Sequence, residues 1–467
     1  MQTEEIKQNK MGTAPMLPLI FSMALPAMFS MLVQALYNIV DSYFVAQVSE
    51  KALAAVSLAF PLQNLLIAFA VGTAVGVTSL ISRRLGEGRQ DEANSAATHG
   101  VVLAICTWVL FALYGAFFST PFFELFETDQ EIIRMGSSYI SICCVFSFGI
   151  FVEVTLEKTL QATGNMIWPM IFQLIGAITN IILDPIMIFG LLGFPAMGVA
   201  GAAIATVTGQ ITAMVVASLV ITFRDHDIHI SFRNFRPNPK IIKDIYIVGV
   251  PSIVMQSIGT VMTMALNGIL SSFSTAAYTV FGLYFKLQSF VFMPVFGLNQ
   301  GALPVMGYNY GARNKKRLFG AYRIALGTAV AIMLLGFVLF QLIPEPMLMM
   351  FVDRTDAAAT QEMLTVGVPA LKTISLSFVG AAFGIINSTV FQATARGMNS
   401  LIVSVCRQLV IILPAAWVLG RFVGLSAIWY SFPIAEIASF LISYLLLWRE
   451  YQTELKYLGS GQEEAKA

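Results

Sequence analysis

The sequence predicts an all-α membrane protein with twelve transmembrane helices in two lobes of six. Three observations support this fold: a composition poor in charge, apolar runs of membrane-spanning length, and an internal repeat. Apolar residues make up 57% of the 467 residues and charged residues only 11%, whereas a soluble domain carries about 25% charged residues. So few charges cannot cover the surface of a soluble chain of this size, which excludes an ordinary soluble enzyme and a disordered protein.

Apolar stretches long enough to cross a bilayer recur along the whole chain. About 20 residues of helix span the hydrocarbon core, and a helix satisfies its own backbone polar groups there. Strands of a membrane barrel would be about 10 residues long with alternating polarity, and no stretch of the sequence shows that pattern. We place the twelve spans at residues 16–46, 52–82, 93–119, 132–160, 165–191, 198–223, 242–271, 276–306, 318–342, 365–391, 400–420 and 425–448.

The chain repeats itself once. Pro26 and Gln63 are matched by Pro251 and Gln288, 225 residues later, and the triplet Gln-Ala-Thr at 161–163 recurs at 392–394. Six spans return the chain to the side on which it started, so the two halves have the same orientation, as in transporters built of two like bundles. The repeat predicts a terminal segment 1–15, a first lobe 16–223, a linker 224–241, a second lobe 242–448 and a tail 449–467.

Lys and Arg residues gather at one end of the expected spans. Eighteen lie on the side of the termini and four on the opposite side. The positive-inside rule then places both termini in the cytoplasm, and we expect the chain in the cytoplasmic membrane of a bacterium, with the lipid bilayer as its partner. Because the basic loops are explained as topology signals, we expect no nucleic-acid partner. We also expect a monomer without a cofactor.

Two carboxylic acids lie deep in apolar sequence. Asp41 and Asp184 each fall about 8–10 Å inside the outer end of their span, at 1.5 Å per residue, so they share one level of the first lobe. A charged, unpaired carboxylate there costs about 2.5–3.5 kcal/mol on the insertion scale. Such a carboxylate is tolerated in a membrane span where it faces a cavity, holds a proton or binds a cation. The alternative is that both are ordinary helix-end aspartates that reach bulk water.

Polar neighbours on the same helix faces favour a shared site. Asn180 lies one turn before Asp184, and Thr206 reaches a similar depth from the next span. With these oxygens alongside, the pair of acids can hold a proton or ligate Na⁺, so Asp41, Asn180, Asp184 and Thr206 are the predicted cation-coupling residues and a possible Na⁺ site.

Further polar residues are candidates for a relay or for lining a substrate pocket. They are Gln34, Tyr37, Asn38, Glu157, Lys286 and Gln288. For Glu157 the alternative is an interfacial charge beside Lys158. For Arg407 we expect the side chain to reach up to the interface, although Glu436 could be its partner. Pro26 removes a backbone hydrogen bond within the first span and is a candidate hinge.

No hydrolytic or redox constellation is present in the sequence. A phosphate-cradling Gly-Lys-Ser/Thr motif is missing, and no span carries a His-x-x-x-His metal pattern. We therefore expect a protein that is not an enzyme and that uses an ion gradient rather than ATP.

Five stretches resemble the multidrug and toxic compound extrusion (MATE) family of transporters. They read QALYNIVDSYFVAQ at 34–47, LEKTLQATGN at 156–165, TNIILDPIMIFG at 179–190, GVAGAAIATVTGQ at 198–210 and PVMGYNYGARN at 304–314. Together with the twelve spans and the parallel repeat, the resemblance covers the chain from about residue 11 to residue 451.

The resemblance implies a V-shaped pair of lobes and an antiporter that expels cationic or amphipathic drugs in exchange for H⁺ or Na⁺. In many members of the family the cation site uses an acid in the first helix, an Asn and an Asp in the fifth and a Thr in the sixth. These fall on Asp41, Asn180, Asp184 and Thr206. Another branch uses acids in the seventh and tenth helices, where this chain has only Asp244 at a helix mouth, so it resembles the branch with a first-lobe site.

A flippase for a lipid-linked cell-envelope precursor is the alternative function. Such a protein needs a cationic cleft for pyrophosphate. The deepest cations here lie in the second lobe, whereas acids dominate the first.

Overall fold

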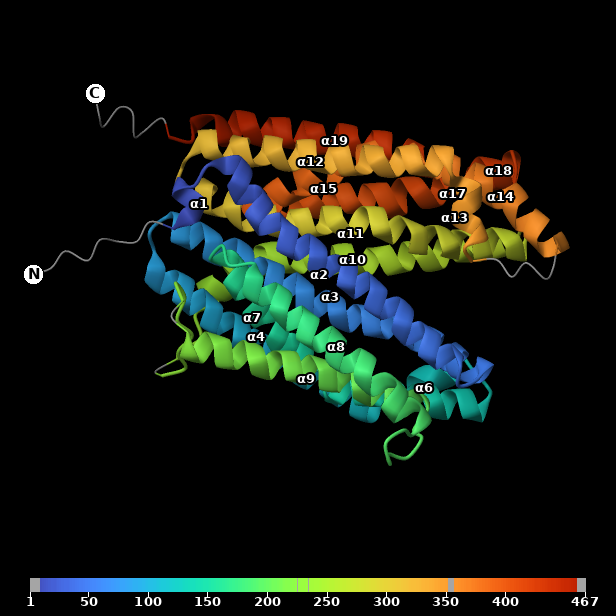
Figure 1. Cartoon of the computed structure of the whole chain (residues 1–467). Coiled ribbons are helices and arrows are strands. Elements are labelled where there is room, and N and C mark those ends of the chain that lie inside the picture. Colours follow the sequence, from blue (N-terminus) through green and yellow to red (C-terminus); the bar gives the residue numbers. More distant parts are fainter. Residues whose placement is uncertain (1–8, 225, 234, 352–356, 460–467) are drawn as a thin grey trace, which may run out of the picture.

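The computed structural model describes residues 9–224, 226–233, 235–351 and 357–459, which form helices joined by short loops, with no strand among them (Figure 1). In the first lobe the helices are α2 (Met16–Ala46), α3 (Glu50–Gly86), α4 (Gln90–Phe117), α5 (Ser119–Glu124), α6 (Gln130–Val145), α7 (Phe148–Ala162), α8 (Ile167–Phe189) and α9 (Val199–Phe223). A short helix α1 (Lys10–Thr13) precedes them.

The second lobe repeats this order. Its helices are α10 (Pro239–Ser271), α11 (Thr275–Gly311), α12 (Lys315–Leu342), α13 (Pro344–Met349), α14 (Ala357–Ser375), α15 (Phe378–Ala393), α16 (Gly397–Val405), the π-helix η1 (Cys406–Ile412), α17 (Leu413–Phe422), α18 (Leu425–Ile428) and α19 (Ser431–Thr453), followed by the 3₁₀ turn η2 (Leu455–Tyr457). The π-helix lies inside one span, Gly397–Phe422.

The predicted count of spans is confirmed, but two of the spans are not straight. Within the described residues ten helices are long and apolar enough to cross a bilayer, and two more spans are bent pairs, of 45° for α6 with α7 and 46° for α14 with α15. At these bends the hydroxyls of Ser147 and Ser377 donate to the carbonyl three residues earlier, at 2.7 and 2.6 Å. Such a bond competes with the backbone hydrogen bonds of the helix. Spans 132–160 and 365–391 are therefore each two helices.

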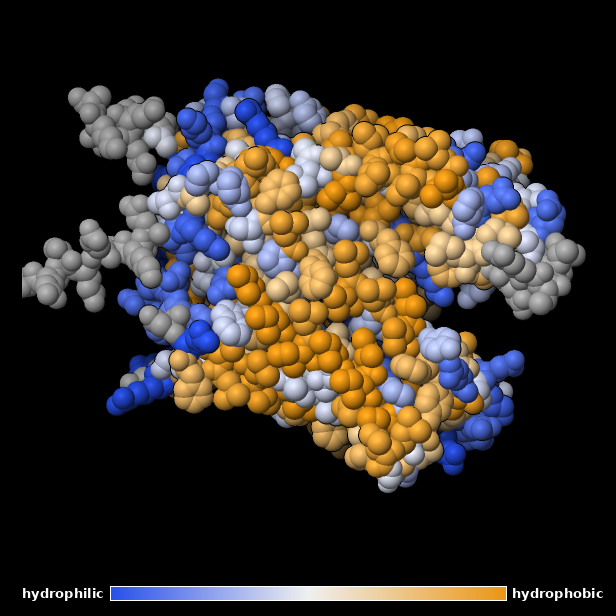
Figure 2. Space-filling view, in the orientation of Figure 1, coloured by the Kyte–Doolittle hydropathy of each residue, from blue (hydrophilic) through white to orange (hydrophobic). Residues whose placement is uncertain are grey.

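The two lobes form a V. They meet at the end that carries the chain termini and diverge at the other end, where Figure 2 shows the surface hollowed between them. Apolar side chains cover the sides of both lobes, and hydrophilic side chains gather at the two ends (Figure 2). A soluble monomer rarely exposes so continuous an apolar surface, so this band marks the part that faces lipid.

Glycines allow the lobes to approach closely at the terminal end. Helix α3 packs against α10 and α11, and α2 packs against α11. A Cβ on Gly86 would collide with the carbonyl oxygen of Tyr308, and a Cβ on Gly311 would collide with that of Arg83. Because Gly86 and Gly311 are equivalent in the repeat, one crossing is made twice around an approximate two-fold axis, and each contact needs a residue without a side chain.

Several predicted boundaries shift by a few residues, and two of the changes have a clear physical reason. Helix α10 begins at Pro239 rather than at 242, because Pro is favoured in the first helical turn and the Asn238 side chain caps the helix by accepting from Lys240 N at 3.0 Å. The predicted segment 1–15 is also not wholly free polar chain: Met11 is fully buried, and its carbonyl accepts from Asn309 Nδ2 at 3.0 Å. Residues 1–8 of that segment lie outside the described residues.

Candidate cation site between helices α2, α8 and α9

The two predicted acids face each other. Asp41 on α2 and Asp184 on α8 lie close enough for their carboxyl groups to interact, and Asp184 is fully buried. Two ionised carboxylates at close range repel each other, so a proton or a cation shared by the pair is favoured. Asp41 Oδ1 is buried without a hydrogen-bond partner among the described residues. The pair therefore has a free acceptor that a proton or a small cation can use.

Asn180 and Thr206 complete the cluster. With the Asn180 amide oriented to satisfy both neighbours, its nitrogen donates to Asp184 Oδ2 at 2.9 Å and its oxygen accepts from Thr206 N at 3.1 Å and Oγ1 at 3.2 Å. Asn180 is 2% exposed and Thr206 4%. The predicted set of four thus comes together from three helices, and it presents carboxylate, amide and hydroxyl oxygens, the ligands that hard cations take.

Tyrosines enclose the cluster. The Tyr37 side chain on α2 lies near Thr206 and near both acids. Tyr139 on α6, 2% exposed, lies near Asp41 and donates to Gln63 Oε1 on α3 at 3.4 Å. Neither Tyr139 nor Gln63 was predicted for this site from the sequence. The match of Gln63 with Gln288 in the repeat was the only feature of the sequence that singled Gln63 out.

Two of the predicted residues on α2 lie outside this cluster. The Asn38 side chain is exposed, and neither Asn38 nor Gln34 makes a side-chain hydrogen bond to another described residue. Pro26 lies within α2, which runs unbroken from Met16 to Ala46. None of these three residues contacts the acids, and their roles as lining and hinge positions stay predictions.

Glu157 belongs to a second buried network, nearer the termini. Its Oε1 accepts from Gln161 Nε2 at 2.6 Å and its Oε2 from Gln173 Nε2 at 2.9 Å. Glu157 and Lys158 are 2% and 6% exposed. The alternative of an interfacial charge is therefore wrong, because both side chains point into the protein rather than toward a membrane surface.

Lys158 connects the two lobes. Its Nζ lies 3.4 Å from Glu157 Oε1, donates to Gln161 Oε1 at 2.8 Å, and reaches Gln300 Oε1 on α11 of the second lobe at 2.5 Å. Since α8 carries both Gln173 of this network and the Asn180 of the cation cluster, one helix joins the two. The contact to Gln300 had no signal in the sequence.

The second-lobe candidates are not brought to the acids. Lys286 is exposed and forms no ion pair with another described residue, and Gln288 is half-buried on the same helix, α11. Arg407 does not reach to the interface as expected: its Nη1 lies 3.5 Å from Glu436 Oε2, and Glu436 is 6% exposed. The suggested partnership of Arg407 with Glu436 is confirmed.

A site of the kind that binds transition metals is not indicated. The described residues contain no group of three or more His, Cys, Asp and Glu side chains arranged to hold a metal ion. The mixed oxygen cluster of Asp41, Asp184, Asn180 and Thr206 is the set on which a monovalent cation would rely.

Comparison with known proteins finds a matching family profile and relatives that are named as transporters. The profile described as MatE matches residues 26–186 and 251–418, which are the two repeats. The chain is 25% identical to the multidrug export protein MepA of Staphylococcus aureus over 93% of its length and 94% of that protein. It is 23% identical to an FAD transporter of Shewanella oneidensis, over 94% of its length and 95% of that protein.

A solved structure shares the whole fold. It is described as the outward-facing conformation of a multidrug resistance MATE family transporter of the MOP superfamily. Its TM-score to this chain is 0.89 at 26% identity, and the match covers 97% of this chain and 99% of that one.

Proposed function

The chain belongs to the MatE family of membrane transporters, and on that premise we propose that it exports cationic and amphipathic organic compounds in exchange for H⁺ or Na⁺. Multidrug export is the activity named for its relative MepA. The observation that carries the exchange is the proximity of the Asp41 and Asp184 carboxyls in a cluster with an open acceptor. Such a pair binds a cation in one arrangement of its helices and releases it in another.

The open end of the V supports an outward-facing state. The lobes meet at the end of the termini and diverge at the other, and the relative with a TM-score of 0.89 is described as outward-facing. The positive-inside rule puts the termini in the cytoplasm, so the hollow opens to the exterior of a bacterial cytoplasmic membrane.

In this state the cycle begins with the ion. A proton or Na⁺ entering from outside binds Asp41 and Asp184, neutralises their charge and weakens the hold on a cationic substrate, which leaves through the hollow. An ion drives the change of access only if it binds the two states differently. Asp41 lies on α2 with Pro26, about four turns away, so bending of α2 at Pro26 would alter the distance between the acids.

Closure at the terminal end is supplied by the second network. The Lys158 contact to Gln300 joins the first lobe to the second near the termini. Opening toward the cytoplasm separates these lobes at that end and must break this contact. The ion site and this contact share α8 as a mechanical link through Gln173.

The test is efflux from proteoliposomes with a pH gradient or a Na⁺ gradient imposed separately. Asp41→Asn and Asp184→Asn should each abolish gradient-driven efflux of a cationic dye, while Asp91→Asn, at an exposed position in the first turn of α4, should match the wild type. Unchanged efflux in both site variants would reject the proposal. Accumulation of lipid-linked precursors in cells lacking the protein, without drug sensitivity, would favour a flippase instead.

A further inference from the structure

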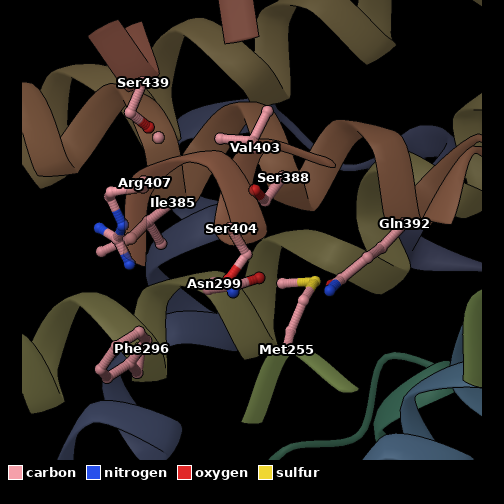
Figure 3. Close-up of a pocket in the computed structure, with 11 residues that line it drawn as sticks. Met255, Phe296, Asn299, Ile385, Ser388, Gln392, Val403, Ser404, Arg407 and Ser439 are labelled. Carbon is pink, nitrogen blue, oxygen red and sulfur yellow. The ribbon is translucent and has the colours of Figure 1, made fainter. Parts of the chain in front are cut away.

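A cavity of about 110 Å³ lies inside the second lobe, away from the acids of the first (Figure 3). It is bounded by α11, α15, α16, η1 and α19, and Met255 of α10 also lines it. Helices α10 and α11 are the ones that pack against the first lobe. Phe296 on α11 is 40% exposed, so the cavity has an aromatic edge that remains open to the surroundings.

Arg407 brings a positive charge to this cavity. It is the second residue of the π-helix η1, a turn with one more residue than an α-helical turn and frequent at functional sites. The Arg407 side chain is 28% exposed, and its pairing with Glu436 is long, at 3.5 Å, where a close charged hydrogen bond would measure about 2.7–2.9 Å. This contact uses one of the five N–H donors of the guanidinium.

Buried polar groups beside Arg407 lack partners. The Ser439 hydroxyl is fully buried, lines the cavity and has no hydrogen-bond partner among the described residues. Glu436 Oε1, on the same helix one turn before Ser439, is also buried and unpartnered. Figure 3 shows Ser439, Arg407 and Asn299 arranged around one space. Unpaired buried groups are costly, and an acceptor oxygen of a ligand in the cavity can take a hydrogen bond from the Ser439 hydroxyl.

We propose that this cavity is a subsite for the carboxylate of an amphipathic aromatic substrate, a proposal that rests on the export function proposed above and extends it to zwitterionic cargo. Arg407 presents a planar fork that matches a carboxylate and binds it through two hydrogen bonds. Ser439 donates a further one, and the aromatic ring of the substrate lies against Phe296. Before substrate arrives, the Glu436 carboxylate occupies Arg407 as an internal competitor.

Size and charge favour a carboxylate over a phosphate. The cavity of about 110 Å³ receives one acid group, not a whole drug, so the ring system stays outside it. A doubly charged phosphate would meet stronger repulsion from Glu436 than a singly charged carboxylate does. The two lobes thus offer opposite charges: acids at Asp41 and Asp184 for a cationic end, and Arg407 for an anionic end.

A matched pair of dyes tests this subsite. Rhodamine 110 carries a free carboxyl group, and rhodamine 123 is its methyl ester with the same ring system. Binding to the purified full-length protein is measured by fluorescence anisotropy, and efflux is measured in proteoliposomes. Because a charged hydrogen bond contributes about 1.5–3 kcal/mol, Arg407→Gln should weaken rhodamine 110 binding about tenfold or more and leave rhodamine 123 within about twofold. Arg421→Gln, an exposed arginine at the end of the same span, should change neither.

The competitor gives a second expected result. Glu436→Gln removes the carboxylate that occupies Arg407 and should strengthen rhodamine 110 binding. If Arg407→Gln does not fold, Arg407→Gln with Glu436→Gln removes both charges and should bind rhodamine 123 but not rhodamine 110.

The refuting results are equally distinct. Equal loss of both dyes in Arg407→Gln, unchanged rhodamine 110 binding in that variant, or recovery of both dyes in the double variant would overturn the subsite. A wild type that exports rhodamine 123 but does not bind rhodamine 110 would refute the subsite alone. Efflux of neither dye under either gradient would refute the export function, while the direct binding measurement still decides the subsite.

Discussion

Gln300 offers a direct way to shift the balance between outward-facing and inward-facing states. Its Oε1 accepts from Lys158 Nζ at 2.5 Å, across the two lobes. Gln300→Leu removes that acceptor with little change in volume. Lys158 retains Gln161 at 2.8 Å and Glu157 at 3.4 Å within its own lobe, so the buried charge is not left alone and the first lobe should fold normally.

The expected size of the shift is worked from the charged hydrogen bond lost, which is the shortest contact of the Gln300 side chain with the first lobe; Gln161 Nε2 and Met31 Sδ lie farther away, each at 3.4 Å. A hydrogen bond to a charged group contributes about 1.5–3 kcal/mol net, and this one exists only while the lobes are closed at the terminal end. Its loss should therefore change the ratio of outward-facing to inward-facing molecules by about tenfold to 150-fold toward the inward-facing state.

Distance measurements between spin labels give the ratio directly. Labels at Phe194 and Phe422, which are 49% and 78% exposed near the open end of the two lobes, report the separation of the lobes there. In Gln300→Leu the population with the shorter separation should grow. Cys106 is exposed and is replaced by Ser in every sample.

Gln341→Leu is the matched control. The Gln341 side chain donates to the Lys372 carbonyl at 2.7 Å and to Ser375 Oγ at 3.0 Å, and both partners belong to the second lobe, as Gln341 does. This variant loses glutamine hydrogen bonds within one lobe and should leave the distance distribution unchanged. An unchanged distribution in Gln300→Leu as well would show that the contact to Lys158 does not hold the lobes together.

Three further predictions concern packing, pH and the hinge. Gly311→Ala adds a Cβ against a carbonyl of α3 and should lower stability by about 1–3 kcal/mol, seen as a lower Tm in detergent, whereas Gly327→Ala, with open space around it, should match or exceed the wild type. Burial raises the pKa of Glu454, but hydrogen bonds from a tyrosine of α11 and from Arg396 outweigh it and hold the pKa below its ordinary 4.5. The stability that this group adds is present above pH 4.5 and is lost as pH falls through the lower folded value, so the Tm difference from Glu454→Gln should be largest near neutral pH and vanish in acid. Pro26→Ala should slow dye efflux while equilibrium dye binding persists, and wild-type efflux rates would argue against a hinge there.

Helix number and depth were predictable because they depend on local properties. A span needs enough apolar residues to cross hydrocarbon, and the rise of about 1.5 Å per residue places Asp41 and Asp184 at one level without any knowledge of their neighbours. The bends at Ser147 and Ser377 were not predictable in this way, since hydropathy stays high through both breaks and only the direction of the chain changes.

The site was predictable in its members more than in its contacts. Asp41, Asn180, Asp184 and Thr206 were found from depth and helical spacing, and they meet as expected. Tyr139 was missed because a tyrosine in an apolar span carries no sign of which neighbour it faces. For Lys158 the sequence suggests an interfacial charge, because a charged residue near a helix end has a simple local explanation until its partner is known.

What the amino-acid order alone determined here is the set of membrane spans, their repeat and the level of each charge. The spans and the levels follow from counting residues along single helices, and the repeat follows from matching residues between the two halves. Tertiary packing decided the rest. Packing between the lobes brought Gln300 against Lys158 and closed the lobes over Gly86 and Gly311, and packing within the second lobe turned Arg407 toward Glu436 and a cavity. Rotation about a helix axis and partners from distant segments are set by the fit of surfaces in three dimensions, and such fit leaves no local pattern in the chain.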